Sequence, residues 1–134
     1  IPLRLVGSEM CIRDRHNFLH PEEEPRTAYL TQKLQGAEGP VVAVSDFMHA
    51  VQDQIRPWVP QRFATLGADG FGFSDTRAAA RRFFKIDGPS IVVRTLQSLA
   101  EDGVVDRSLA AQAIQKYSLH DVNAGTSGNA GGES

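Results

Sequence analysis

The chain has 134 residues, 41% of them hydrophobic, and a formal net charge of −2, so it is long enough for one domain at most. Its mild acidity and the lack of any Lys- and Arg-rich run argue against a nucleic-acid partner. No apolar stretch in the sequence approaches the about 20 residues needed to span a bilayer, and a single cysteine, Cys11, excludes an intrachain disulfide.

The first fifteen residues, IPLRLVGSEMCIRDR, have neither an amphipathic pattern nor the layout of a signal peptide. Their VGSEMCIRDR portion resembles a translated sequencing adapter, so we interpret residues 1–15 as an artefact; the alternative is an ordinary disordered N-terminus. Residues 16–38 follow as a lead-in connector, in which adjacent carboxylates beside prolines, at Glu22–Glu24, are typical of a solvated linker.

Two short apolar runs predict strands. Val41–Val44 is a continuous β-branched run, as expected for a strand that is buried on both faces of a parallel sheet. Phe63–Leu66 is the next strand, and a right-handed crossover between the two would set them parallel. The segment from 39 to 122 is therefore expected to be an α/β domain.

A helix is expected between these strands. Ser45 or Asp46 can cap it, and Pro57 and Pro60 are expected to kink and close it. Its predicted apolar face consists of Met48, Val51, Ile55 and Trp58.

A glycine-rich loop follows the second strand. Gly67, Gly70 and Gly72 allow a tight path and close backbone approach. Ser74 or Asp75 can then cap a helix over residues 76–84. Ser74 is interpreted as this cap in preference to a ligand contact. Arg77 in the first turn opposes the helix dipole, so we expect an acidic partner such as Asp69 or Asp75, or a contact with a facing subunit.

Two further helices complete the pattern. Asp87 can cap one that stops at Gly103, and Asp106 can cap the other. The expected apolar positions are Val92, Leu96 and Leu99 in the first, and Leu109, Ala113, Ile114 and Tyr117 in the second. Residues 123–134 are small, polar and glycine-rich, which predicts a disordered tail.

No residue is nominated as catalytic. Residues 67–72 read GADGFG, without the Lys-Ser or Lys-Thr of a P-loop, and Asp69 and Asp75 would repel an anion held there. The four histidines, His16, His20, His49 and His120, have no metal-ligand spacing. His49 is expected to be a solvated or packed side chain on a helix flank, and the glycines to serve backbone geometry while the aspartate makes local hydrogen bonds.

Four stretches carry a resemblance to a known family, in family order from residue 19 to 122. They read LHPEEEPRTAYLTQKL, GPVVAVSDFMHAVQDQIRPWVP, TLGADGFGFSDTR and RRFFKIDGPSIVVRTLQSLAEDGVVDRSLAAQAIQKYSLHDV. Together they resemble the C-terminal domain of the first component of pyruvate dehydrogenase, of the homodimeric, thiamine-dependent type. The resemblance implies an incomplete three-layer αβα domain, similar to the C-terminal domain of transketolase, with a mixed, mostly parallel sheet of about five strands.

The same resemblance implies a function for the parent enzyme, a cytoplasmic homodimer. That enzyme decarboxylates pyruvate and reductively acetylates a lipoyl group of the acyltransferase component, with thiamine diphosphate and magnesium bound in other domains. Here Asp69–Gly70 does not complete the family's cofactor motif, because position 68 is alanine and the first asparagine after Asp69 is Asn123. The chain is expected to bind neither cofactor, to carry no catalytic or metal residue, and to be structural. Its family-motif loop comprises Gly67, Asp69, Gly70, Phe71, Gly72, Ser74, Asp75 and Arg77.

Three other interpretations stay open on the sequence alone. The chain could be a small α/β module that binds a ligand at the strand ends above Gly67–Gly72, or a protein-interaction domain with an exposed apolar surface. Transketolase itself is the nearest enzyme alternative, since it shares the Phe-Gly-x-Ser pattern of Phe71–Ser74.

Overall fold

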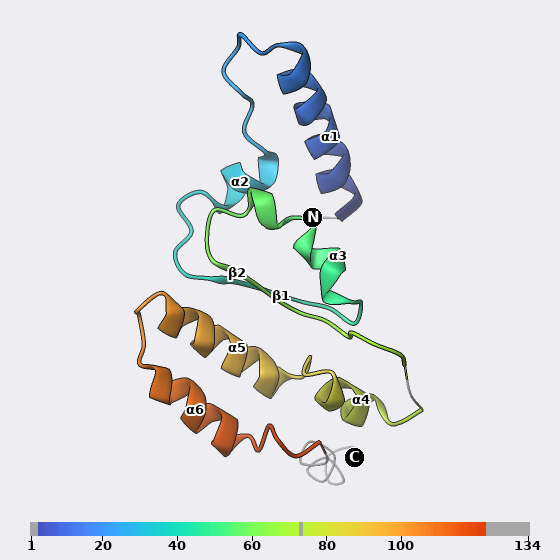
Figure 1. The fold of residues 1–134 in the computed structure, drawn as a ribbon, viewed down its shortest axis with the longest axis vertical. Helices are drawn as coiled ribbons and strands as arrows, with labels where there is room; N and C mark the ends of the chain where they lie inside the picture. The colour runs from blue at the N-terminus through green and yellow to red at the C-terminus, as the bar shows by residue number, and fades with distance from the viewer. Residues whose placement is uncertain (1–2, 73, 123–134) are drawn as a thin grey trace, which may run out of the picture. The chain divides into compact units, whose positions relative to one another are not determined.

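The computed structural model describes residues 3–72 and 74–122; the tail predicted for residues 123–134 lies outside them. The elements in chain order are α1 (Leu3–Leu19), α2 (Tyr29–Leu34), β1 (Val41–Val44), α3 (His49–Asp53), the 3₁₀ helix η1 (Arg56–Trp58), β2 (Phe63–Leu66), α4 (Arg77–Phe83), α5 (Gly88–Glu101) and α6 (Arg107–Lys116) (Figure 1). The chain divides into two compact units, one of residues 1–38 with 55–61 and the other of residues 39–54 with 62–134.

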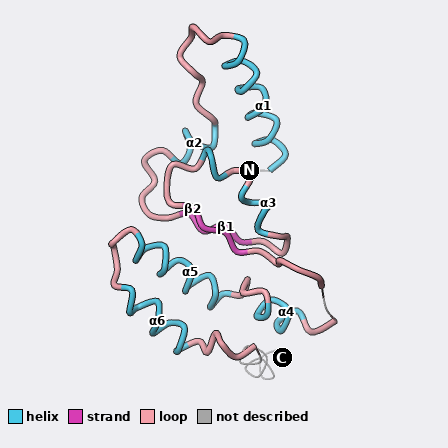
Figure 2. The backbone as a smooth tube through the Cα atoms, in the orientation of Figure 1, coloured by secondary structure: helices cyan, strands magenta, loops and turns pink. Residues whose placement is uncertain are grey.

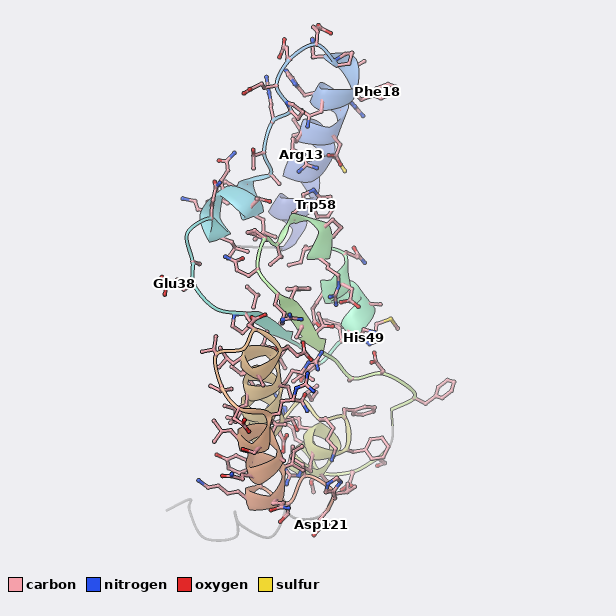
Figure 3. The ribbon with its side chains drawn as sticks, turned by 60° about the vertical axis from the view of Figure 1, so that its left-hand side comes forward. Arg13, Phe18, Glu38, His49, Trp58 and Asp121 are labelled. Carbon is pink, nitrogen blue, oxygen red and sulfur yellow. The ribbon has the colours of Figure 1, made fainter. Side chains whose placement is uncertain are left out.

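The first unit contains α1, α2 and η1. The sequence shows no amphipathic pattern over α1, and its helix formers, Leu, Arg, Met and Glu, favour the helix by intrinsic propensity instead. The guanidinium of Arg13 lies 5.5 Å from the centre of the Trp58 ring (Figure 3). Thr31 Oγ1 donates to the Trp58 carbonyl at 2.5 Å, and Gln61 Nε2 donates to the Leu34 carbonyl at 2.6 Å. These bonds hold residues 55–61 against α2.

The second unit is built on the two strands. Strands β1 and β2 pair in parallel, with Val41 opposite Phe63 and Val44 opposite Leu66, which confirms both predicted strands and their direction. Helix α3 lies on one side of the strand pair, and α5 lies on the other (Figure 2). An α/β unit of this kind places the carboxyl ends of both strands, and the loops that follow them, at one edge.

A small apolar core lies between α5 and α6. Val93, Ala113 and Leu119 are buried there, with Leu96, Ile114 and Tyr117 packed against them. The predicted faces are wrong at two positions, because Val92 and Leu109 are exposed. Helix α5 contacts both the strands and α6, so its buried stripe is centred one residue further along, on Val93.

Three helices end in the same hydrogen-bonded turn. After α5, the N–H of Gly103 donates to the Ala100 carbonyl and that of Val104 to the Leu99 carbonyl, with Gly103 at φ +75°. This confirms Gly103 as the predicted stop. The same turn closes α4 and α6, where the left-handed position holds Lys85 (φ +58°) and Ser118 (φ +47°) instead of glycine. A side chain at such a position carries steric strain that glycine avoids.

Predicted N-caps are confirmed in two helices and wrong in two. Asp87 accepts from the Ser90 N–H at 3.1 Å, and Asp106 accepts from the Ser108 N–H at 2.7 Å. Helix α4 is capped by Thr76, whose hydroxyl accepts from the Ala79 N–H at 3.3 Å, rather than by Ser74 or Asp75. Helix α4 begins one residue later than predicted, at Arg77, so Thr76, the last residue with a hydroxyl before the helix, occupies the N-cap position.

The predicted single helix after β1 is two short pieces, α3 and η1. Pro57 lies in the first turn of η1, which confirms that it ends the regular α-helix. Met48 occupies the N-cap position of α3 and is exposed, so it does not belong to a buried face with Val51, Ile55 and Trp58. Neither Ser45 nor Asp46 caps α3; the Ser45 hydroxyl accepts from the Phe47 N–H instead.

Candidate functional site

The glycine loop after β2 runs directly against the start of α3. A Cβ atom built on Gly67 would lie 2.3 Å from the His49 nitrogen and 2.6 Å from the Phe47 carbonyl oxygen, so only glycine fits there. The Ala68 N–H donates to that same Phe47 oxygen at 2.9 Å. Gly70 adopts φ +112°, whereas Gly72 has neither a positive φ nor a close neighbour. Two of the three loop glycines are thus required by geometry.

Asp69 supplies the cap that the local sequence of α3 lacks. Its Oδ1 accepts from the backbone N–H of His49, the first residue of the helix, at 3.0 Å, across 20 positions of sequence. Its Oδ2 pairs with Nδ1 of the His49 ring. The backbone N–H of His49, followed by its ring, holds the pKa of Asp69 below the ordinary value of 3.8. The loop aspartate therefore makes hydrogen bonds, as predicted, but to a distant segment.

His49 lies between two carboxylates. Besides Asp69, its Nε2 lies 3.6 Å from Asp53 Oδ2 on the same helix. Thr65 Oγ1 of β2 donates to Asp53 at 3.1 Å. A histidine oriented by a carboxylate is the arrangement of many acid–base pairs. Here half of each of the His49 and Asp69 side chains is exposed, and none of the contacts described brings a serine or cysteine to the ring.

The sequence could not predict this cluster, because its members are separated by a strand and a turn. Spacing alone relates His49 to Asp53 at i,i+4, but nothing local relates either to Asp69. The cluster ties the loop, α3 and β2 together, and we interpret it as a structural junction at the carboxyl edge of the strands.

The other predicted loop residues lie at the surface. Phe71, Ser74, Asp75 and Arg77 are all exposed, and Asp75 Oδ1 accepts from the Thr76 N–H at 2.7 Å. Among the contacts of residues 3–72 and 74–122, Arg77 makes no ion pair with Asp69 or Asp75.

The described residues do not fit thiamine diphosphate or magnesium. Residues 3–72 and 74–122 contain no group of three His, Cys, Asp or Glu side chains that could hold a metal ion, whereas magnesium binds through carboxylates and phosphates. Asp69, the acid of the glycine loop, is already bound to His49. No step that depends on either group is derived from this chain.

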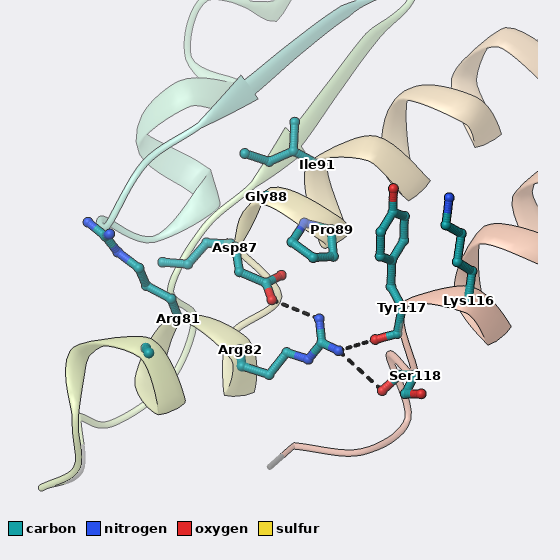
Figure 4. A pocket seen from close by; sticks show the side chains of 11 residues that line it. Arg81, Arg82, Asp87, Gly88, Pro89, Ile91, Lys116, Tyr117 and Ser118 are labelled. Carbon is teal, nitrogen blue, oxygen red and sulfur yellow. Dashed lines mark hydrogen bonds and ion pairs between the residues drawn. The ribbon is translucent and has the colours of Figure 1, made fainter. Parts of the chain in front are cut away.

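A cavity of about 730 Å³ opens between α4, the start of α5 and the end of α6 (Figure 4). Arg82 forms part of its wall and is almost fully buried. Its Nη1 donates to Asp87 Oδ2 at 2.8 Å, and its Nη2 donates to the Tyr117 carbonyl and, at 3.3 Å, to the Ser118 carbonyl. Nε reaches the Asp121 carbonyl at 3.4 Å. Four of the five guanidinium N–H groups thereby have acceptors, and they hold residues 117–121 against the junction of α4 and α5.

Asp87 makes two kinds of contact. Its carboxylate caps α5 by accepting from the Ser90 N–H, and it also forms an ion pair with Arg82. Burial raises the pKa of Asp87, but the hydrogen bonds from Ser90 and Arg82 outweigh burial and hold that pKa below 3.8. The sequence predicted this cap. The same pattern predicts that Arg81 and Arg82 both turn away from the apolar side of α4, which is wrong for Arg82, because it is buried.

Comparison with known proteins then decides the family. The model of the transketolase-like TK C-terminal domain matches residues 14–87, a span that includes both strands, α3 and the glycine loop. The chain belongs to this family. The family therefore accounts for the parallel strand pair and the loop that follows it.

Several relatives of this transketolase-like chain carry the name pyruvate dehydrogenase E1 component. The protein of Mycolicibacterium smegmatis is 56% identical over 111 residues, that of Mycobacterium tuberculosis 53% over 105 residues, and that of Corynebacterium glutamicum 52% over 116 residues. These matches cover 83%, 78% and 87% of the chain, but only 12%, 11% and 13% of the relatives. The predicted resemblance is confirmed, and the chain spans about an eighth of such a protein.

None of the helices in the described part of the chain has the length and apolarity that crossing a bilayer requires.

Proposed function

We propose that this chain is part of a pyruvate dehydrogenase E1 component of the homodimeric type, a cytoplasmic enzyme that decarboxylates pyruvate and acetylates a lipoyl group of its acyltransferase partner. The observation that carries the proposal is the 56% identity over 111 residues to the Mycolicibacterium smegmatis protein of that name. Thiamine diphosphate and magnesium would be held by parts of the enzyme outside this chain, as the occupied Asp69 and the lack of a metal-binding group in residues 3–72 and 74–122 suggest.

Within that enzyme, the role we propose for this region is support of the protomer and of the dimer. Two features favour it. The cluster at His49 joins the loop, α3 and β2, and the buried guanidinium of Arg82 beside the cavity is bound by Asp87 and backbone carbonyls. A short piece of this kind is expected to have no activity alone.

We further propose that additional strands of the enzyme complete the sheet. Val41–Val44 is only partly buried along its whole length, although parallel strands in complete domains are buried on both faces. A pair of strands also leaves two open edges. Strands on these edges would produce the three-layer αβα domain with a mixed sheet, formed here by residues 39–122 after a connector at 16–38.

The proposed boundary at residue 15 has partial support from the family match. That match begins at residue 14, so most of the adapter-like segment IPLRLVGSEMCIRDR falls outside it. Sequencing the native locus upstream of the codon for His16 tests this boundary: a different continuous frame is expected, and the same fifteen codons in genomic DNA would contradict it.

A chimera tests the proposed function. Residues 16–134 would replace the matching region of the Mycolicibacterium smegmatis protein, and pyruvate-dependent reduction of an artificial electron acceptor would be measured. We expect a dimeric, active chimera, an inactive protein when the region is deleted, and no turnover by the 134-residue chain alone. A chimera that is folded and dimeric but inactive would refute the proposal.

Arg77 offers a test of the supporting role. It is the exposed first residue of α4, and Arg107 is the exposed first residue of α6, which makes Arg107→Ala a matched control. In the chimera, Arg77→Ala is expected to weaken dimerisation by about tenfold, as loss of one interface arginine would, and Arg107→Ala to leave it unchanged. Equal dimer affinities for both variants would remove Arg77 from the interface.

A further inference from the structure

The cavity between α4, α5 and α6 has a lining of two kinds. Its middle part is apolar and includes Ile86, Pro89 and Ile91. Arg81, on α4, and Lys116, the last residue of α6, lie on opposite sides of this middle part (Figure 4). Its volume of about 730 Å³ falls within the range of ligand pockets, about 300–1,000 Å³. The cavity is therefore large enough for a small organic molecule.

The negative charge in the cavity lining is already neutralised. Asp87 supplies the one carboxylate among the described residues of the lining, and it pairs with Arg82 and accepts from Ser90. Arg82 also binds the Tyr117 and Ser118 carbonyls, which would otherwise place negative partial charge at the end of α6. Arg82 is thus occupied by groups of the lining itself, and the two other cations remain to attract a ligand.

These two cations, Arg81 and Lys116, are held only weakly. Nη2 of Arg81 lies 3.8 Å from Oδ2 of Asp46, and the two side chains are 41% and 70% exposed. Because an ion pair with this exposure is weak, an anion in the cavity can compete with Asp46 for Arg81. The ammonium group of Lys116 lies 5.6 Å from the centre of the Tyr117 ring, a contact that does not neutralise its charge. Each end of the cavity therefore offers a cation to a ligand.

We propose that this cavity binds a small organic dianion with an anionic group at each end and an apolar body between them. One end contacts Arg81, the other contacts Lys116, and the body lies along Pro89 and Ile91. Carboxylate and phosphate groups both accept hydrogen bonds from such cations, so a dicarboxylate and a bisphosphate share the required chemistry. This site goes beyond the proposed function, because it needs none of the chemistry of pyruvate decarboxylation.

Binding is measured in the chimera, with thiamine diphosphate and magnesium supplied so that their own site is occupied. Adipate is the probe, and hexanoate, which has the same chain length but one carboxylate, is its control. Hydrogen exchange at increasing probe concentration is expected to slow in peptides that cover residues 81–91 and 116–118. Adipate is expected to bind about fivefold more tightly than hexanoate. Equal affinities, or protection confined to other peptides, would overturn the proposal.

Variants that remove one charge test the two ends of the site. Arg81→Gln and Lys116→Gln are each expected to lower the affinity for adipate about fivefold, to that of hexanoate. Arg107→Gln removes the same charge from the exposed first residue of α6, outside the cavity lining, and should leave the affinity unchanged. An equal loss in all three variants would indicate general attraction to a positive surface and would overturn the proposal.

Asp46→Asn provides a prediction of the opposite sign, which loss of folding cannot mimic. Because Asp46 competes with the ligand for Arg81, its neutralisation is expected to raise the affinity for adipate about twofold to threefold. The same substitution combined with Arg81→Gln should have no effect. An equal gain in both backgrounds, or no gain in either, would overturn the contact between Arg81 and the ligand.

Hexanediol bisphosphate distinguishes the two kinds of anionic end group. Binding tighter than that of adipate would support a dianion with phosphate ends, and weaker binding would support one with carboxylate ends. If neither compound slows exchange around the cavity, the proposal is overturned. None of these measurements requires turnover, so absence of binding is recognised separately from failure of the proposed function.

Discussion

Arg82 is predicted to be the side chain on which the C-terminal part of this domain depends most. Its side chain is 3% exposed, and it donates to Asp87 and to the carbonyls of Tyr117, Ser118 and Asp121. Breaking a buried charge pair by removing one partner costs about 3–5 kcal/mol. Asp87 is 17% exposed and keeps its bonds to Ser90, so water can partly solvate it, and we expect Arg82→Ala to cost about 3 kcal/mol.

The neighbouring arginine provides the control. Arg81 is 41% exposed and lies 3.8 Å from Asp46, so Arg81→Ala should cost about 0.5 kcal/mol or less. Arg82→Lys keeps the charge but loses the planar fork, and should fall between the two.

Native-state hydrogen exchange of α5 and α6 in the chimera measures these costs without requiring two-state unfolding of a large enzyme. The 3 kcal/mol predicted for Arg82→Ala corresponds to a loss of about 150-fold in protection, against about twofold for Arg81→Ala. Similar protection in the two alanine variants would refute the assignment of Arg82 as a buried clamp.

Three further outcomes follow from backbone geometry and charge. Gly67→Ala should destabilise the domain by about 2 kcal/mol because its Cβ would meet backbone atoms at 2.3 Å, while Gly72→Ala, with open space around it, should be neutral in thermal unfolding. Ser118→Gly should slow hydrogen exchange at the end of α6, because glycine removes the strain of a side chain at φ +47°, which is worth about 0.5–1 kcal/mol. Gly103→Ala should introduce the same strain at the end of α5 and destabilise it by about 1 kcal/mol. Because the pKa of Asp69 is lowered below 3.8, its stabilisation of α3 is present above that pH and is lost as the pH falls further. Below that pH, the hydrogen-exchange protection of the first amide of α3 should therefore decrease, after correction for intrinsic exchange. Asp69→Asn should abolish this pH dependence.

Local patterns in the sequence were sufficient for much of the fold. Val41–Val44 and Phe63–Leu66 are strands, as their short and mostly apolar runs predict. Asp87 and Asp106 cap helices because each cap lies next to the helix that it serves. Prediction failed where two local candidates competed, as at Thr76 against Ser74, and where one helix packs on two neighbours.

The parts that could not be predicted are contacts between distant segments. Asp69 caps α3 from 20 positions away, and Arg82 reaches carbonyls 35 to 39 positions further along the chain. No periodicity or spacing marks such pairs, because the fold brings them together. The family resemblance, carried by the strings around Gly67–Arg77, identified the domain but gave no role to His49.

The most direct test of the account is the steady-state kinetics of the chimera with pyruvate. If this region supports the enzyme without contributing to its chemistry, kcat and the KM for pyruvate should each stay within about threefold of the values of the unmodified Mycolicibacterium smegmatis protein. A chimera that is equally stable and dimeric, but whose KM or kcat differs by more than about tenfold, would contradict the account, because a region that only supports the protomer leaves both values unchanged.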